Sequence, residues 1–269
     1  MGRPMRRLTT FTCDGATLGA TLDDASGATG VLMVTGGSQT RIGSHRMYER
    51  LASALAIQGI PCFRFDRRGV GDSEGADPGY RGSGPDIAAA TAAFRAARPG
   101  LARIVGFGLC DGATALALFG ASAGLDGLIL ANPWLVEAEA GQPAPAAIKR
   151  HYRDRLLSRE GWAKMLSGSV SYRKLFRGII QILRPAPPAD LASETAAALA
   201  ARPLPLAVIL CRKDATAIAA EDAWKAPVFA PVRNGAPLYV ETDSHTFARP
   251  GDEQALREAC FAALERIEA

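Results

Sequence analysis

One segment of this 269-residue sequence has the composition of a catalytic turn. Residues 104–108 form a β-branched apolar run that ends in glycine, Cys110 follows shortly, and an Ala- and Leu-rich helical pattern begins at once. In such a strand–turn–helix, Cys110 takes the place of the serine of a G-x-S-x-G nucleophile elbow. Gly108 and Gly112 leave the space that a strained turn requires, and the start of the helix favours a thiolate. A buried structural cysteine before a glycine-rich turn is the alternative interpretation.

The order of the polar residues downstream favours the nucleophile. Asp214 lies three residues after the end of the apolar segment 205–211. His245 lies shortly after the end of a second apolar segment, 237–241. Nucleophile, acid and histidine come in this order, each after a strand, in α/β-hydrolases. We therefore predict a Cys110–His245–Asp214 triad.

The choice of the acid has alternatives. Three further carboxylates are candidates: Glu221, Asp222 and Asp243. Asp243 is two residues from His245 and is poorly placed to reach its imidazole across the site. Asn132, which follows the preceding strand, cannot act as a carboxylate, and this excludes the usual alternative position. Asp214 is therefore the preferred acid.

Backbone amides for an oxyanion hole are expected at two places. The apolar strand over residues 30–35 ends close to Gly37 and Ser38, where the first amide would lie. The second belongs to Asp111, directly after the nucleophile. Its carboxylate would disfavour a thiolate if it pointed inward, so we expect it to point away or to bond a loop.

Strands and helices alternate along the chain, the pattern of a mostly parallel sheet with helices on both faces. We predict an α/β-hydrolase fold with a core of residues 1–133 and 189–269. The expected strands are 9–13, 17–21, 30–35, 62–66, 103–109, 127–131, 205–211 and 237–241. The expected core helices are 45–58, 84–97, 111–123 and 252–267. The segment 66–73 is interpreted as a structural loop in which the strand-end Asp66 pairs with an arginine.

Residues 134–188 interrupt this alternation, and we predict that they form a helical cap over the site. The segment is basic and carries Lys149, Arg150, Arg153, Arg155, Arg159, Lys164, Arg173, Lys174, Arg177 and Arg184 against Asp154 and Glu160. A solvated helical face explains such charges. The alternative is attraction of an anionic substrate, such as a carrier-bound acyl group, or of an acidic partner.

Three residues are candidate substrate contacts: His45, Trp134 and Arg153. His45 opens a helix beside the expected oxyanion segment, although a surface histidine at a helix start is the alternative. His151 lies among the arginines of the cap and is expected to be exposed or packed within it.

The composition excludes several classes of protein. The five cysteines are Cys13, Cys62, Cys110, Cys211 and Cys260. They are odd in number and lack C-x-x-C spacing, so we expect no disulfide framework, metal or cofactor. The net charge of +4 is too small to indicate nucleic acid. No signal peptide or apolar membrane span is evident, and we expect a cytoplasmic protein with reduced cysteines.

Several motifs give the chain a resemblance to a known family. They are GGSQTRIGSHR at 36–46, FDRRGVGDSEG at 65–75, GLCD at 108–111, NPW at 132–134, the segment 151–162 and HTF at 245–247. With these motifs the chain resembles the exosortase A system-associated hydrolases of the first type. The resemblance implies an α/β-hydrolase with a cysteine nucleophile, encoded in bacteria beside exopolysaccharide and protein-sorting functions. The Ala-rich stretch at 190–201 and residues 211–213 are unlike that family.

The chemistry that these residues predict is acyl transfer to a thiol. His245 takes the proton of Cys110, the thiolate attacks a carbonyl, and water or another acceptor resolves the thioester. The expected function is hydrolysis of a small or carrier-bound carboxylic ester or thioester. An acyltransferase with the same intermediate and a non-catalytic scaffold of the same fold are the alternatives.

Overall fold

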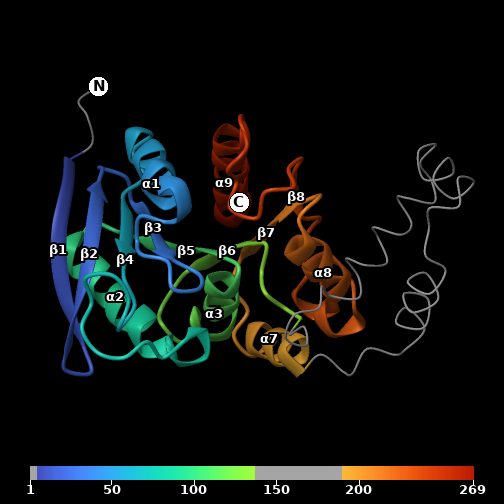
Figure 1. Cartoon of the computed structure of the whole chain (residues 1–269), viewed down its shortest axis with the longest axis horizontal. Helices are drawn as coiled ribbons and strands as arrows, with labels where there is room; N and C mark the ends of the chain where they lie inside the picture. Colours follow the sequence, from blue (N-terminus) through green and yellow to red (C-terminus); the bar gives the residue numbers. More distant parts are fainter. Residues whose placement is uncertain (1–4, 137–189) are drawn as a thin grey trace, which may run out of the picture.

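A computed structural model describes residues 5–136 and 190–269, and a single sheet runs through its centre (Figure 1). The strand order is β1-β2-β4-β3-β5-β6-β7-β8. The strands are β1 (Met5–Cys13), β2 (Ala16–Asp24), β3 (Thr29–Val34), β4 (Cys62–Phe65), β5 (Arg103–Leu109), β6 (Gly127–Ala131), β7 (Leu206–Cys211) and β8 (Leu238–Val240). Pairing is antiparallel from β1 to β4 and parallel from β4 to β8. The predicted α/β-hydrolase fold class is confirmed.

Helices cover both faces of this sheet. They are α1 (Met47–Ile57), α2 (Gly84–Ala97), α3 (Asp111–Phe119), α7 (Asp190–Ala201), α8 (Ala215–Trp224) and α9 (Asp252–Glu268). In Figure 1, α1 and α9 lie on one face, and α2 and α3 lie on the other. Because both faces are covered, β3, β5, β6 and β7 are almost wholly buried, which explains their continuous apolar sequences.

Several boundaries differ from the prediction. β1 and β2 are longer than expected, because they form a hairpin whose turn residues, Asp14 and Gly15, both have positive φ. α1 begins at Met47, since His45 and Arg46 before it also have positive φ. α3 ends at Phe119, four residues early, and neither α7 nor α8 was predicted.

The parallel register brings the site residues to one edge of the sheet. Val34 pairs with Gly108, Leu109 with Ala131, and Cys211 with Val240. The loops after β3, β5, β6, β7 and β8 therefore leave the sheet side by side.

Of the predicted cap, residues 137–188 lie outside the described part of the chain, as do His151 and Arg153. Within the described ranges, no helix combines the length and the apolar character that crossing a membrane requires.

Candidate active site

Cys110 occupies a strained turn between β5 and α3. Its backbone has φ 60° and ψ −126°, outside the regions that L-residues ordinarily adopt. A Cβ at Gly108 would lie 2.7 Å from the Ala113 nitrogen, and one at Gly112 would lie 2.6 Å from the Val34 oxygen. These close approaches explain why glycine stands on either side of the nucleophile position. Cys110 is partly exposed, whereas the other four cysteines are buried.

Backbone hydrogen bonds hold Cys110 from two elements. Its N–H donates to the Ala131 oxygen at 3.0 Å, and its carbonyl accepts from the Trp134 N–H at 3.2 Å. The same carbonyl accepts from the Ala113 and Thr114 N–H groups in the first turn of α3. The residue is therefore fixed by its own helix and by the segment that follows β6.

His245 and Asp214 are in contact. The His245 Nδ1 lies 2.9 Å from the Asp214 Oδ2, and that oxygen also accepts from the Ala217 N–H at 2.9 Å. Asp214 is thus the N-cap of α8, and this bond fixes its carboxylate. An aspartate before an Ala-rich run is a helix-start signal that the sequence analysis did not use.

The His245 imidazole also interacts with Cys110. Burial alone would lower the pKa of His245, but hydrogen bonds to Asp214 and Cys110 outweigh it and raise the pKa from the usual 6.5 to about 10. Since Asp214 occupies Nδ1, Nε2 is left for the sulfur. With a pKa of about 10, the imidazole is protonated at neutral pH.

The competing carboxylates have other partners or positions. Glu221 accepts from the Tyr239 hydroxyl and pairs with Lys225. Asp243 pairs with Arg249, which lowers the pKa of that carboxyl, and Asp222 is exposed. Among the described residues, Asp214 is the carboxylate that the structure brings to the His245 ring.

The expected oxyanion segment is bound on both sides of Gly37. The Gly37 N–H donates to the Asp111 Oδ1 at 2.6 Å, so the Asp111 carboxylate bonds a loop. The Gly37 carbonyl accepts from the Arg67 Nη2. The Gly37 amide is therefore already engaged. In a trans peptide the N–H points opposite to the preceding carbonyl, so the Ser38 N–H points away from Arg67.

Arg67 is a site residue that sequence reasoning missed. Its side chain is only 2% exposed, and its Nε and Nη1 have no hydrogen-bond partner among the residues that the structure describes. The expected pairing of Asp66 with an arginine exists, but the partner is Arg41, not one of the arginines that follow it. Arg68 instead pairs with Asp86 and Asp14. Arg67 lies inside a loop motif that was interpreted as structural, and the motif gave no indication that this side chain contacts the expected oxyanion segment.

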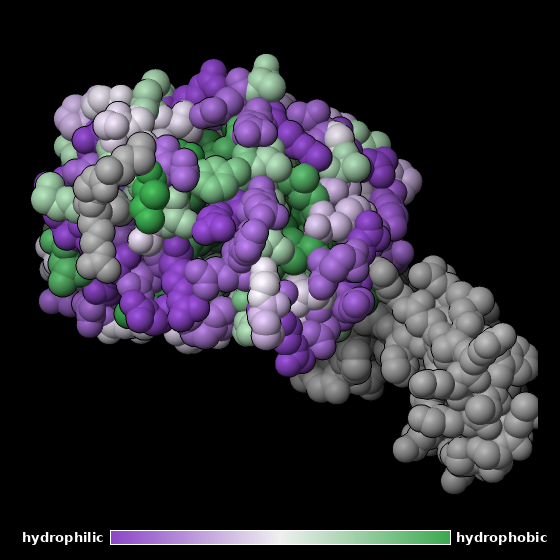
Figure 2. Space-filling model, turned by 90° about the horizontal axis from the view of Figure 1, so that it is seen from above, coloured by the Kyte–Doolittle hydropathy of each residue, from purple (hydrophilic) through white to green (hydrophobic). Residues whose placement is uncertain are grey.

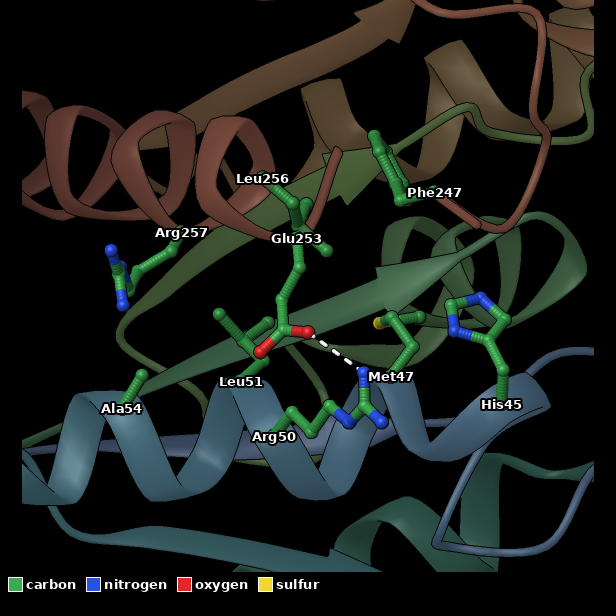
Figure 3. A pocket seen from close by; sticks show the side chains of 9 residues that line it. All are labelled: His45, Met47, Arg50, Leu51, Ala54, Phe247, Glu253, Leu256 and Arg257. Carbon is green, nitrogen blue, oxygen red and sulfur yellow. Dashed lines mark hydrogen bonds and ion pairs between the residues drawn. The ribbon is translucent and has the colours of Figure 1, made fainter. Parts of the chain in front are cut away.

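His45 contacts the loop that carries His245. Its Nε2 lies 2.7 Å from the Thr246 oxygen, and its ring lines a small pocket between α1 and α9 (Figure 3). The triad residues are not among those that line this pocket. Figure 2 shows the molecule from above, and on the face seen there apolar residues lie between hydrophilic ones.

Trp134 is partly buried, and its backbone binds Cys110 and Thr114. Arg153 lies outside the described residues. In the ranges that the structure describes, no group of three or more His, Cys, Asp or Glu side chains is arranged to hold a metal ion.

Comparison with known proteins agrees with the fold. Residues 31–255 match the model of the alpha/beta hydrolase family. The chain belongs to the alpha/beta hydrolase family. No curated protein matches this hydrolase in sequence.

Solved structures resemble this hydrolase in fold. An esterase of Pyrococcus furiosus is 15% identical, with a TM-score of 0.63, covering 99% of this chain and 92% of that chain. A dienelactone hydrolase of Anabaena variabilis is 14% identical, with a TM-score of 0.65 and 99% of both chains covered. An α/β serine hydrolase without lid from Xanthomonas campestris is 19% identical, with a TM-score of 0.60, covering 97% and 94%.

Proposed function

We propose that this hydrolase cleaves a carboxylic ester or thioester through an acyl-cysteine formed on Cys110. Two observations carry the proposal: the 2.9 Å contact of the His245 Nδ1 with the Asp214 Oδ2, and the interaction of the same imidazole with Cys110, which contributes to its raised pKa. A strained strand–helix turn presents the sulfur, and a capped carboxylate orients the imidazole. This is the arrangement of nucleophile, base and orienting group that covalent catalysis requires.

In the reacting form, the proton of Cys110 resides on His245 and the sulfur attacks as a thiolate. The thiolate attacks the carbonyl carbon, and the oxyanion accepts hydrogen bonds from the Asp111 and Ser38 N–H groups. Each such donor contributes on the order of 3 kcal/mol. The imidazolium then gives its proton to the leaving alkoxide or thiolate as the carbon–heteroatom bond breaks. Water, deprotonated by His245, attacks the thioester, releases the acid and restores the thiolate–imidazolium pair.

The test is the trapping of the intermediate. The protein is mixed with p-nitrophenyl acetate and with acetyl-coenzyme A, quenched in acid and analysed by intact mass. We expect one acetyl adduct on Cys110, none in Cys110→Ala, and unchanged labelling in Cys260→Ala, which alters a buried cysteine of α9. His245→Ala should slow acylation by roughly 10²–10⁴-fold. Full turnover by Cys110→Ala would overturn the proposal.

The fate of the adduct separates the alternatives. Loss of the acetyl group to water alone supports a hydrolase, whereas transfer to added amines or thiols in preference to water indicates an acyltransferase. Absence of any adduct across a panel of acyl lengths indicates a non-catalytic scaffold.

We also propose that this hydrolase acts beside a bacterial exosortase and exopolysaccharide system. The proposal rests on the motifs by which the chain resembles the exosortase A system-associated hydrolases. The proposal predicts genes for those functions next to its own, and a genomic neighbourhood without them would contradict it. The basic composition of residues 149–184 further favours an anionic, carrier-bound acyl donor. In that case kcat/KM for a coenzyme A thioester falls more steeply with salt concentration than kcat/KM for a neutral ester. Salt screens the attraction between the basic segment and the anionic donor, since the Debye length is only about 10 Å at 0.1 M.

A further inference from the structure

The last residue of β6 and the segment that follows it bind the backbone of Cys110 at both its N–H and its carbonyl. The Ala131 oxygen accepts from the Cys110 N–H at 3.0 Å, and the Trp134 N–H donates to the Cys110 oxygen at 3.2 Å. This contact follows from the topology, because β6 lies between β5, which leads to Cys110, and β7, which leads to Asp214. The end of β6 is therefore adjacent to the ends of β5 and β7.

Asn132 lies within this segment and is completely buried. Its φ of 41° is in the left-handed region, which asparagine tolerates better than most residues. Its Oδ1 accepts from the Cys211 N–H at 2.8 Å, three residues before Asp214. Its Nδ2 donates to the His245 oxygen at 3.2 Å and to the Cys211 Sγ at 3.1 Å. One side chain thus joins the end of the acid strand to the backbone of the histidine.

We propose that Asn132 is a positioning residue, which sets the place of His245 relative to Cys110 and Asp214. This inference rests on the proposed function. Residues 131–134 bind the nucleophile through their backbone, while the Asn132 amide binds the acid strand and the histidine. A displacement of one part of the triad relative to another by about 1 Å can reduce the rate about 10²-fold.

The chemistry of the side chain supports this role over that of an unused acid position. The amide must donate, since the His245 carbonyl and the Cys211 sulfur are both acceptors, and it must also accept from the Cys211 N–H. An ionised carboxylate at this position could accept but not donate. The neutral amide of Asn132 satisfies all three partners.

The test compares two variants in the full-length protein. Asn132→Gly removes the side chain and keeps the positive φ without strain. Cys211→Ala is the matched control, because it removes the contacts of the Cys211 sulfur with the Asn132 Nδ2 and with the Ser244 oxygen but keeps the bond from Asn132 to His245. Three quantities are measured: kcat and KM for p-nitrophenyl acetate, the pH profile of Cys110 alkylation by iodoacetamide, and the thermal unfolding midpoint.

Positioning and a merely structural role give different results. We expect Asn132→Gly to lower kcat about 10²-fold with KM nearly unchanged, and to move the pH midpoint of alkylation, because the His245–Cys110 pair loses its alignment. Cys211→Ala should lower the unfolding midpoint but leave kcat and the pH midpoint unchanged. The inference is overturned if Asn132→Gly lowers only the unfolding midpoint, or if Cys211→Ala loses kcat equally.

These outcomes are separable from failure of the proposed function. If the wild type forms no acyl adduct, the proposed function fails, while the alkylation profile still reports how Asn132 affects the His245–Cys110 pair. If the adduct forms and Asn132→Gly matches the wild type in kcat and in the pH midpoint, only the positioning role fails.

Discussion

The carboxylate of Asp111, the residue after Cys110, accepts a hydrogen bond from the Gly37 N–H at 2.6 Å. The Arg67 guanidinium binds the carbonyl of the same glycine. A negative group from α3 and a positive group from the loop after β4 therefore hold one residue of the oxyanion segment. Asp111 thus has two separable parts: the backbone amide that we propose as an oxyanion donor, and a carboxylate that binds the Gly37 N–H.

We predict that Asp111→Ala lowers kcat/KM about 10-fold or more, because the oxyanion segment loses its anchor while the Asp111 amide remains. The loss should stay below the roughly 10²–10³-fold that follows removal of an oxyanion donor itself. Asp111→Asn should lose less, since its amide oxygen still accepts from the Gly37 N–H. Steady-state hydrolysis of p-nitrophenyl acetate measures these differences.

Alkylation by iodoacetamide is the control for the Asp111 variants, since that reaction forms no oxyanion. Its rate on Cys110 should be unchanged or faster in Asp111→Ala, because a negative charge beside the thiolate is removed. A parallel fall in alkylation and hydrolysis would show instead that Asp111 supports the thiolate.

The raised pKa of His245 predicts a pH dependence of stability. Because the folded-state pKa, about 10, lies above the usual 6.5, the protonated imidazole favours the folded state. This contribution is complete below pH 6.5 and is lost as the pH rises through 10. Urea unfolding of the wild type should therefore show a decrease in unfolding free energy over this interval that His245→Gln lacks. Identical pH dependence in both proteins would contradict the assignment.

Close packing at the elbow predicts a sharp difference between two glycines. A Cβ at Gly112 would lie 2.6 Å from the Val34 oxygen, whereas one at Gly100 would have no atom of the described part of the chain within 4 Å. Gly112→Ala should destabilise the protein by about 1–3 kcal/mol and abolish acylation, since α3 must move away from β3. Gly100→Ala should leave both properties nearly unchanged. Urea unfolding and adduct formation measure the two effects, and equal behaviour of the two variants would argue against the close approach.

The cysteines should differ in reactivity. Burial raises the pKa of Cys13 to about 11 and that of Cys211 to about 12, and it also raises the pKa values of Cys62 and Cys260. Iodoacetamide should therefore modify Cys110 alone in the folded protein and all five cysteines in 6 M guanidinium, as peptide mass spectrometry would show. Early modification of Cys211 would indicate that the interior near Asn132 opens readily.

Apolar periodicity and glycine placement were sufficient to predict the central strands, because β3, β5, β6 and β7 are buried on both faces and end at turns. The order of Cys110, Asp214 and His245 likewise followed from strand ends. Contacts between distant side chains and backbone were not predictable in this way. The Gly37–Asp111 bond joins residues 74 apart, and no local pattern encodes such a partner. The same holds for Arg41 with Asp66 and for Asn132 with His245.

His245 follows β8, which is three residues long and lies at the edge of the sheet. It pairs with β7 at three positions, Ile209–Leu238, Leu210–Tyr239 and Cys211–Val240. Short edge strands open at lower free energy than the centre of a sheet. Warming should therefore detach the histidine loop while the central strands persist, so that inactivation precedes the loss of far-ultraviolet circular dichroism. The thermal limit of this enzyme would then be set by the fraying of one short strand.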